Sequence, residues 1–136
     1  MHGATLEGNE ANLIASFLPV RDPRERLALI MDACAGLGIE GTGRLEPDLV
    51  RECVSRVWLR GEIRDGRFCL GWDAESPLVR GLAGLVCSVY QHTAIEGAAG
   101  HRSRIISVLE LDGLLSPTRL RGLAAVESRI HALGKS

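Results

Sequence analysis

The hydrophobic pattern of the first third of the chain predicts two amphipathic helices. Apolar residues recur at helical spacing from Asn9, a residue type that often caps helices, to Leu18, and Pro19 ends the stretch. A second helix is predicted to begin at Asp22-Pro23, because aspartate accepts from a free amide and proline fits the first helical position. Its apolar face consists of Leu27, Ile30, Met31 and Cys34.

The pattern then changes to a period of two, which predicts a β-hairpin. Polar residues alternate with Val57 and Leu59, and Trp58 falls on the face that is predicted to be exposed. Asp65-Gly66 is a strong turn signal between two strands. The returning strand carries Phe68, Leu70 and Trp72 on one face. Since two strands alone are marginally stable, we expect helices to cover them.

Serine followed by proline marks the start of two further helices, at Ser76-Pro77 and at Ser116-Pro117. The first of these is apolar almost all round, which favours a place in the middle of the core. Gly81 and Gly84 each cost about 1 kcal/mol relative to alanine in a helix, so we expect them to pack closely against a neighbouring backbone. The order of helices, hairpin and helices predicts an α+β fold, with a small antiparallel sheet covered by helices from both ends of the chain.

Length and composition favour one domain over residues 1–136, with an apolar share of 46% that is sufficient for a core. Sixteen basic and seventeen acidic residues give a net charge of -1. A chain of this charge has no general electrostatic attraction to nucleic acids or anionic membranes. The chain has no uncharged stretch long enough to cross a bilayer, and residues 1–20 lack the features of a secretory signal. We therefore expect a cytoplasmic protein that binds neither nucleic acid nor membrane.

The four cysteines are the main candidates for chemistry. They do not form the close pairs typical of zinc sites or small disulfide scaffolds, so we expect free thiols and no metal site. Cys34 and Cys87 fall in buried helical patterns, and Cys69 lies in the second strand, where packing roles are favoured. Cys53 follows a glycine-rich stretch and is flanked by two arginines, which favour the thiolate, and by Glu52, which opposes it. From position alone, a packing role still leads for Cys53.

Three other signals carry less weight. The stretch 36–41 contains G-x-G-x-x-G, but a dinucleotide site needs a strand before this motif and a helix after it, and here a helix precedes it. His92 and His101 have no acidic or cysteine partner at metal spacing, which favours surface or capping roles. A solvated helix face is the default for the basic residues of the last helix, Arg119, Arg121 and Arg129.

Three blocks of sequence resemble the SufE/CsdE family of sulfur acceptors. Residues 50–59, VRECVSRVWL, resemble the family signature V-x-G-C-x-S-x-V-W. Residues 73–82, DAESPLVRGL, resemble its acidic lead into a central helix, and residues 115–123, LSPTRLRGL, are similar to its L-T-P-x-R-x-x-G-L. Because the blocks also keep the family's order and spacing, the resemblance covers the chain from about residue 10 to the C-terminus.

This resemblance implies a small partner of a pyridoxal-phosphate (PLP) dependent cysteine desulfurase of the SufS/CsdA type. Sulfur would pass from the desulfurase persulfide to Cys53 and then to an iron–sulfur scaffold such as a SufB-containing complex. The resemblance implies a sulfurtransferase-like accessory protein with a covalent cysteine persulfide, not a stand-alone enzyme. It implies no cofactor and no metal of its own, an α+β fold, and a monomer or weak homodimer.

Cys53 is the residue that the resemblance marks as catalytic, and Glu52, Ser55, Trp58 and Arg119 are expected to shape its loop or a supporting cavity. Glu52 stands where the family commonly has glycine, which restricts the backbone and adds a negative charge beside the thiol. A non-catalytic SufE-like module that binds or regulates a desulfurase without persulfide turnover is therefore the alternative. A thiol–disulfide oxidoreductase is the weakest interpretation, because the chain has no C-x-x-C pair.

Overall fold

The computed structural model describes residues 4–35, 46–50 and 56–135, which form helices around a three-stranded antiparallel sheet. The elements are α1 (Leu6–Phe17), α2 (Pro23–Ala35), the 3-10 helix η1 (Glu46–Asp48), β1 (Leu49–Val50), β2 (Val57–Arg64), β3 (Arg67–Ala74), α3 (Pro77–Tyr90), η2 (Ala98–Gly100), α4 (Ile105–Val108), η3 (Asp112–Leu114) and α5 (Pro117–Gly134). The α+β class predicted from the sequence is confirmed.

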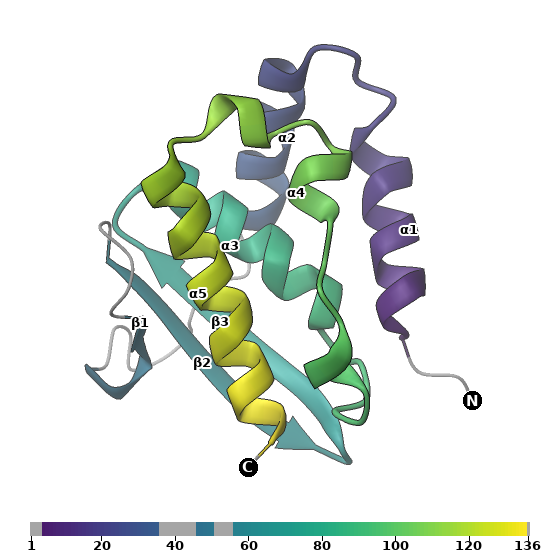
Figure 1. The fold of residues 1–136 in the computed structure, drawn as a ribbon, viewed down its shortest axis with the longest axis vertical. Coiled ribbons are helices and arrows are strands. Elements are labelled where there is room, and N and C mark those ends of the chain that lie inside the picture. The colour runs from purple at the N-terminus through teal and green to yellow at the C-terminus, as the bar shows by residue number, and fades with distance from the viewer. Residues whose placement is uncertain (1–3, 36–45, 51–55, 136) are drawn as a thin grey trace.

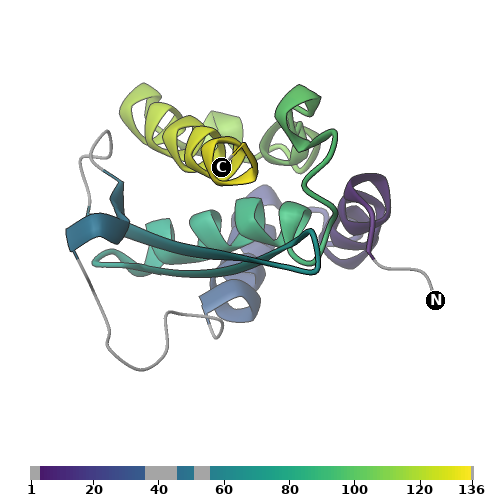
Figure 2. The ribbon, with the colours of Figure 1, turned by 90° about the horizontal axis from the view of Figure 1, so that it is seen from below.

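Helix α3 lies in the middle of the fold, as its apolar sequence predicts (Figure 1). It packs against β3 and against both α2 and α5, which lie on opposite sides of it (Figure 2). Helix α5 also contacts β2, so the hairpin and the two long helices enclose one core. The apolar side chains that the sheet contributes to this core are Val50, Val57, Leu59, Phe68, Leu70, Trp72 and Ala74.

The hairpin of β2 and β3 has the predicted turn, in which Asp65 and Gly66 both have positive φ, at 53° and 72°. Strand β1 was not predicted: Leu49 and Val50 pair with the start of β2 and add a third strand. Two residues are too few to show a period in the sequence, so only the tertiary pairing reveals this strand.

The predicted close contact of α3 with a neighbouring backbone is present, and the neighbour is α2. A Cβ on Gly81 would lie 2.6 Å from the Cα of Met31, and a Cβ on Gly84 would lie 2.5 Å from the carbonyl oxygen of Cys34. The indole nitrogen of Trp72 donates to this same carbonyl at 3.0 Å. Gly84 therefore lies where α2, α3 and β3 meet.

Helix α1 begins earlier than predicted. Thr5 is its N-cap and accepts a hydrogen bond from the amide of Gly8 at 2.9 Å. The side-chain amide of Asn9, the predicted cap, instead donates to the carbonyl oxygens of Val89 and Gln91 at the end of α3. A long-range contact thus replaces the local cap that the residue type predicts. The caps at Ser76 and Ser116 are confirmed.

Arg26 is buried in α2, with 2% of its surface exposed, although a charged residue of an amphipathic helix is expected to face solvent. Its guanidinium donates to the carbonyl oxygens of Phe17, Leu18 and Val20, which follow the end of α1 or belong to its last turn. It also donates to the carbonyl oxygen of Leu109 after α4. One side chain therefore satisfies free carbonyls at the ends of two helices.

The outer edge of β3 is covered by the chain that follows α3. The side-chain amide of Gln91 accepts from the Leu70 amide at 2.7 Å and donates to the Leu70 carbonyl at 2.8 Å. Phe68 donates to the carbonyl oxygen of Thr93 and accepts from the amide of His92. These contacts replace the partner strand that this part of the edge would otherwise lack.

A buried polar cluster joins α5 to α3. The hydroxyl of Tyr90 donates to Glu127 Oε2 at 2.6 Å and lies 2.9 Å from Nε2 of His131, whose other ring nitrogen faces Arg102. Burial lowers the pKa of His131 and raises the pKa of Tyr90. His101, expected on the surface or at a cap, instead pairs with Glu10 of α1 beside this cluster.

We predict that Gly84→Ala destabilises the fold. The new methyl group would meet a backbone carbonyl and the Trp72 indole, and overpacking of this kind costs about 1–3 kcal/mol, more than the helix propensity gained. Chemical denaturation followed by circular dichroism measures the change in the free energy of unfolding. Gly113→Ala is the matched control, because its methyl group would meet no atom within 4 Å. Equal stability of the two variants would contradict the prediction.

We predict that the free energy of unfolding falls when the pH is lowered from about 7.5 to 5.5. His131 has a lowered pKa in the folded state, so the unfolded chain takes up this proton first as the pH falls below about 6.5. Stability is therefore lost in that window, by at most about 1.4 kcal/mol per pH unit from this group. Urea denaturation at both pH values measures the loss. His131→Gln should reduce it, whereas His92→Asn, at an exposed position with positive φ, should leave it unchanged.

Candidate functional site

The candidate site centres on the connection between β1 and β2, which contains three of the residues singled out in the sequence. Glu52, Cys53 and Ser55 lie outside the described residues. The ends of the connection are described: Val50 closes β1 and pairs with Val57 at the start of β2. Both valine side chains are buried, at 2% and 0% exposure. The chain therefore enters and leaves this segment at two adjacent, buried strand positions.

Trp58 is buried, with 6% of its surface exposed, although the alternating pattern predicts an exposed face. It lies in the central strand of the sheet, between Leu49 of β1 and Asp73 of β3. The prediction was wrong, and the cross-strand neighbours Leu49 and Asp73 both place side chains beside Trp58 on this face. Asp73 belongs to β3 and forms an ion pair with Arg80 of α3 at 3.1 Å.

Arg119 lies in the first turn of α5 and is exposed, as the sequence predicts. Its backbone amide donates to the hydroxyl of Ser116, the N-cap of the helix, at 3.2 Å. The described residues include no ion-pair partner for its guanidinium. Its described contact is therefore the cap of its own helix.

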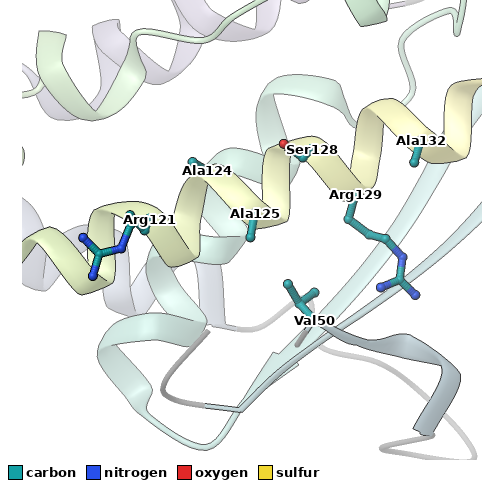
Figure 3. Close-up of a pocket in the computed structure, with 7 residues that line it drawn as sticks. All are labelled: Val50, Arg121, Ala124, Ala125, Ser128, Arg129 and Ala132. Atoms are coloured by element: carbon teal, nitrogen blue, oxygen red, sulfur yellow. The ribbon is translucent and has the colours of Figure 1, made fainter. Parts of the chain in front are cut away.

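A hollow of about 560 Å³ lies between α5 and the end of β1 (Figure 3). One wall is Val50, and the opposite wall is the face of α5 that carries small side chains. The residues that line it are Val50, Arg121, Ala124, Ala125, Ser128, Arg129 and Ala132. The hollow thus lies directly beside the last described residue before Cys53, with arginines on the helix side.

Arg129 was predicted to lie on a solvated helix face. Its guanidinium instead crosses the hollow and binds the backbone at the start of β1. Nη1 donates to the carbonyl oxygen of Leu49 at 3.3 Å, and Nη2 donates to that of Pro47 at 2.5 Å. A second contact fixes the same segment from the sheet, where Arg60 Nε binds Asp48 Oδ2 at 2.9 Å. No sequence signal marks Arg129, because its partners are backbone atoms about 80 residues away.

The three described cysteines carry free thiols. Burial raises the pKa of Cys34 to about 11 and raises the pKa of Cys87 still further, so both stay protonated at neutral pH. The packing role predicted for these two residues is consistent with this environment. Cys69 is half-buried on the outer face of β3.

Residues 4–35, 46–50 and 56–135 contain no group of three or more histidine, cysteine or acidic side chains placed to hold a metal ion. Within those same ranges, each helix is too short or too polar to span a bilayer.

Comparison with known proteins agrees with the fold and with the sequence blocks. The solution structure of a hypothetical protein from Thermus thermophilus superimposes with a TM-score of 0.76, at 20% identity and over 93% of each chain. An uncharacterized SufE-like protein of Synechocystis sp. (strain PCC 6803) is 29% identical over 89 residues, or 63% of this chain. The alignment spans about half of that relative, 55% of its length.

The match to a family model extends over nearly the whole chain. The model of SufE, described as an Fe-S metabolism associated domain, matches residues 11–133. This range includes all three blocks that resemble the family signature. It also includes every described helix and strand from α2 to η3, and α5 up to residue 133. The chain therefore belongs to the SufE family, whose domain is associated with iron–sulfur metabolism.

Proposed function

We propose that this protein is a sulfur acceptor that takes persulfide sulfur from a PLP-dependent cysteine desulfurase onto Cys53. It delivers that sulfur for iron–sulfur cluster assembly, to a scaffold such as a SufB-containing complex. The observation that carries the proposal is the position of Cys53 within the signature block of a chain that belongs to the SufE family.

The described surroundings of the segment support this proposal. Val50 precedes Cys53 by three residues and lies on the wall of a hollow whose α5 side includes three alanines. Apolar side chains disfavour water, and the nearby guanidinium of Arg129 favours an anionic sulfur over a neutral one. A space of this kind suits a persulfide, which is both labile and anionic when ionised.

The transfer step balances without a metal or an external oxidant. The Cys53 thiolate attacks the outer sulfur of the desulfurase persulfide, a new S–S bond forms at Cys53, and the S–S bond of the donor breaks. The donor cysteine leaves as a thiolate, and the zero-valent sulfur keeps its oxidation state. A second thiolate on the next carrier or scaffold then removes the sulfur by the same exchange.

Two of the three described thiols, those of Cys34 and Cys87, are less suited to this role. Only a thiolate attacks, and burial holds Cys34 and Cys87 in the protonated form. A protein whose described cysteines are free suits a reducing compartment, and we place it in the cytoplasm as a monomer or weak homodimer. Its sulfur comes from the desulfurase, so it is an accessory protein and not a stand-alone enzyme.

The remaining residues of the signature have supporting roles in this proposal. Trp58 fills the central strand next to the segment, and Ser55 lies between that strand and Cys53 in the sequence. The exposed guanidinium of Arg119 is free to contact an acidic group of a partner. Glu52 favours the alternative, a module that binds a desulfurase without turnover, because its charge opposes the thiolate.

We predict that incubation with a cysteine desulfurase and free cysteine adds one sulfur atom to Cys53. Intact-mass and peptide mass spectrometry under non-reducing conditions measure the adduct. Cys53→Ser should lose it, and Cys69→Ser, which removes a half-buried thiol on the outer face of the sheet, should keep it. Binding of the desulfurase without any sulfur adduct would instead favour the non-catalytic module.

We predict that Glu52→Gly raises the rate at which iodoacetamide alkylates Cys53 near pH 7. Removal of a neighbouring carboxylate favours the thiolate, and a shift of the thiol pKa by one unit changes the thiolate fraction about tenfold. Glu52→Gln separates the charge from the backbone effect of glycine. A rate in Glu52→Gln no higher than in wild type would show that the charge does not limit reactivity.

A further inference from the structure

A side chain of α5 joins the start of β1 to the helical layer. Arg129 of α5 donates to the carbonyl oxygens of Pro47 and Leu49, on the two residues that flank Asp48. We infer that Arg129 is a positioning residue for sulfur transfer: it fixes the strand from which the chain continues to Cys53. This inference rests on the function proposed above.

Strand β1 is short. It contains only Leu49 and Val50, and its pairing with β2 is limited to two positions. The facing surface of α5 is built from small side chains, Ala124, Ala125, Ser128 and Ala132, which leave a hollow in front of Val50. Small side chains bury little area, and the two hydrogen bonds of the guanidinium link the strand to the helix across this gap.

The segment from Pro47 to Leu49 is bound to the sheet and to the helical layer by two different arginines. Arg60 of β2 binds Asp48 at 2.9 Å and so holds the same segment to the sheet. Arg129 joins it to the helix across the hollow, and Figure 3 shows its side chain extending from α5 toward β1. Arg121 lines the same hollow but extends away from the strand in this view.

The guanidinium suits this role better than an ammonium group would. Its planar, rigid fork offers several donors at fixed angles, so Nη1 and Nη2 each bind a different carbonyl. Lysine keeps the charge but presents it on a flexible stem, which does not hold two carbonyls in one geometry. Arg129→Lys therefore removes the fixed geometry and retains the charge.

Sulfur exchange depends on geometry because the attacking sulfur and the two donor sulfurs must approach in line. An error of about 1 Å in the placement of a reacting group can cost up to about a hundredfold in rate. Looser attachment of β1 should therefore lower the maximal rate of transfer and leave the thiol chemically competent. The substitution of Arg129 should not weaken binding of the desulfurase, because the Arg129 guanidinium donates to backbone carbonyls of its own chain.

The test compares Arg129→Lys with Arg121→Lys, the matched change in the same hollow. Arg121 is exposed and its guanidinium donates within its own helix, to Thr118. Single-turnover sulfur uptake by Cys53 is measured against the concentration of persulfide-loaded desulfurase. We expect Arg129→Lys to lower the maximal rate about tenfold and to leave the half-saturating concentration within about twofold of wild type. Arg121→Lys should change neither value.

Two further measurements separate positioning from a structural defect. Iodoacetamide should alkylate Cys53 in Arg129→Lys at least as fast as in wild type, and amide exchange at Leu49 and Val50 should accelerate while that of α3 is unchanged. A wild-type maximal rate in Arg129→Lys, or a loss that lies wholly in the half-saturating concentration, would overturn the inference. Slower alkylation would do so as well, since it would mean a less reactive thiol.

The same set of variants distinguishes failure of this inference from failure of the proposed function. If wild type acquires no sulfur at Cys53, the proposed acceptor function is wrong. The role of Arg129 in fixing β1 is then tested by amide hydrogen exchange alone. Unchanged amide exchange at Leu49 and Val50 in Arg129→Lys would overturn that role. If wild type is loaded normally and Arg129→Lys matches it, only the inference about Arg129 fails.

Discussion

The close approach of α3 to α2 is the constraint on which the arrangement of the other elements depends. At Gly81 and Gly84 the absence of a side chain lets one helix reach the backbone of the other. Because the Cys34 carbonyl also binds the indole of Trp72, this contact sets where the sheet lies against α3. Helix α5 packs on the opposite side of α3 (Figure 2) and carries Arg129 and one wall of the hollow.

Much of the fold could be predicted because its signals are local. The Ser-Pro starts of α3 and α5, the Asp65-Gly66 turn and the alternating strand β3 each depend on a few neighbouring residues. The errors arose where a distant partner decides the outcome. Asn9 lies beside the end of α3, Trp58 lies in a central strand, and Arg26 is buried by carbonyls from two other helices.

The candidate site combines a residue that the sequence indicates with surroundings that it does not. Cys53 is marked by a motif, and no periodicity singles it out from the other three cysteines. The hollow depends on α5 and β1, whose contacting residues are about 80 positions apart, and on the small side chains between Arg121 and Ala132. Alanines on a helix face are ordinary helix formers, so their role in leaving space becomes visible only when the strand is placed opposite them.

Side chains bind backbone groups at both edges of the small sheet. At β3, Gln91 occupies the backbone groups of Leu70, and the backbone groups of Ala74 are bound by Asp73 and Arg80. At β1, Arg129 occupies the carbonyl oxygen of Leu49. An unprotected margin is a template on which a strand from another molecule can add, the first step toward fibrous aggregates. These polar side chains therefore occupy backbone groups that a strand from another molecule would need in order to add at either edge.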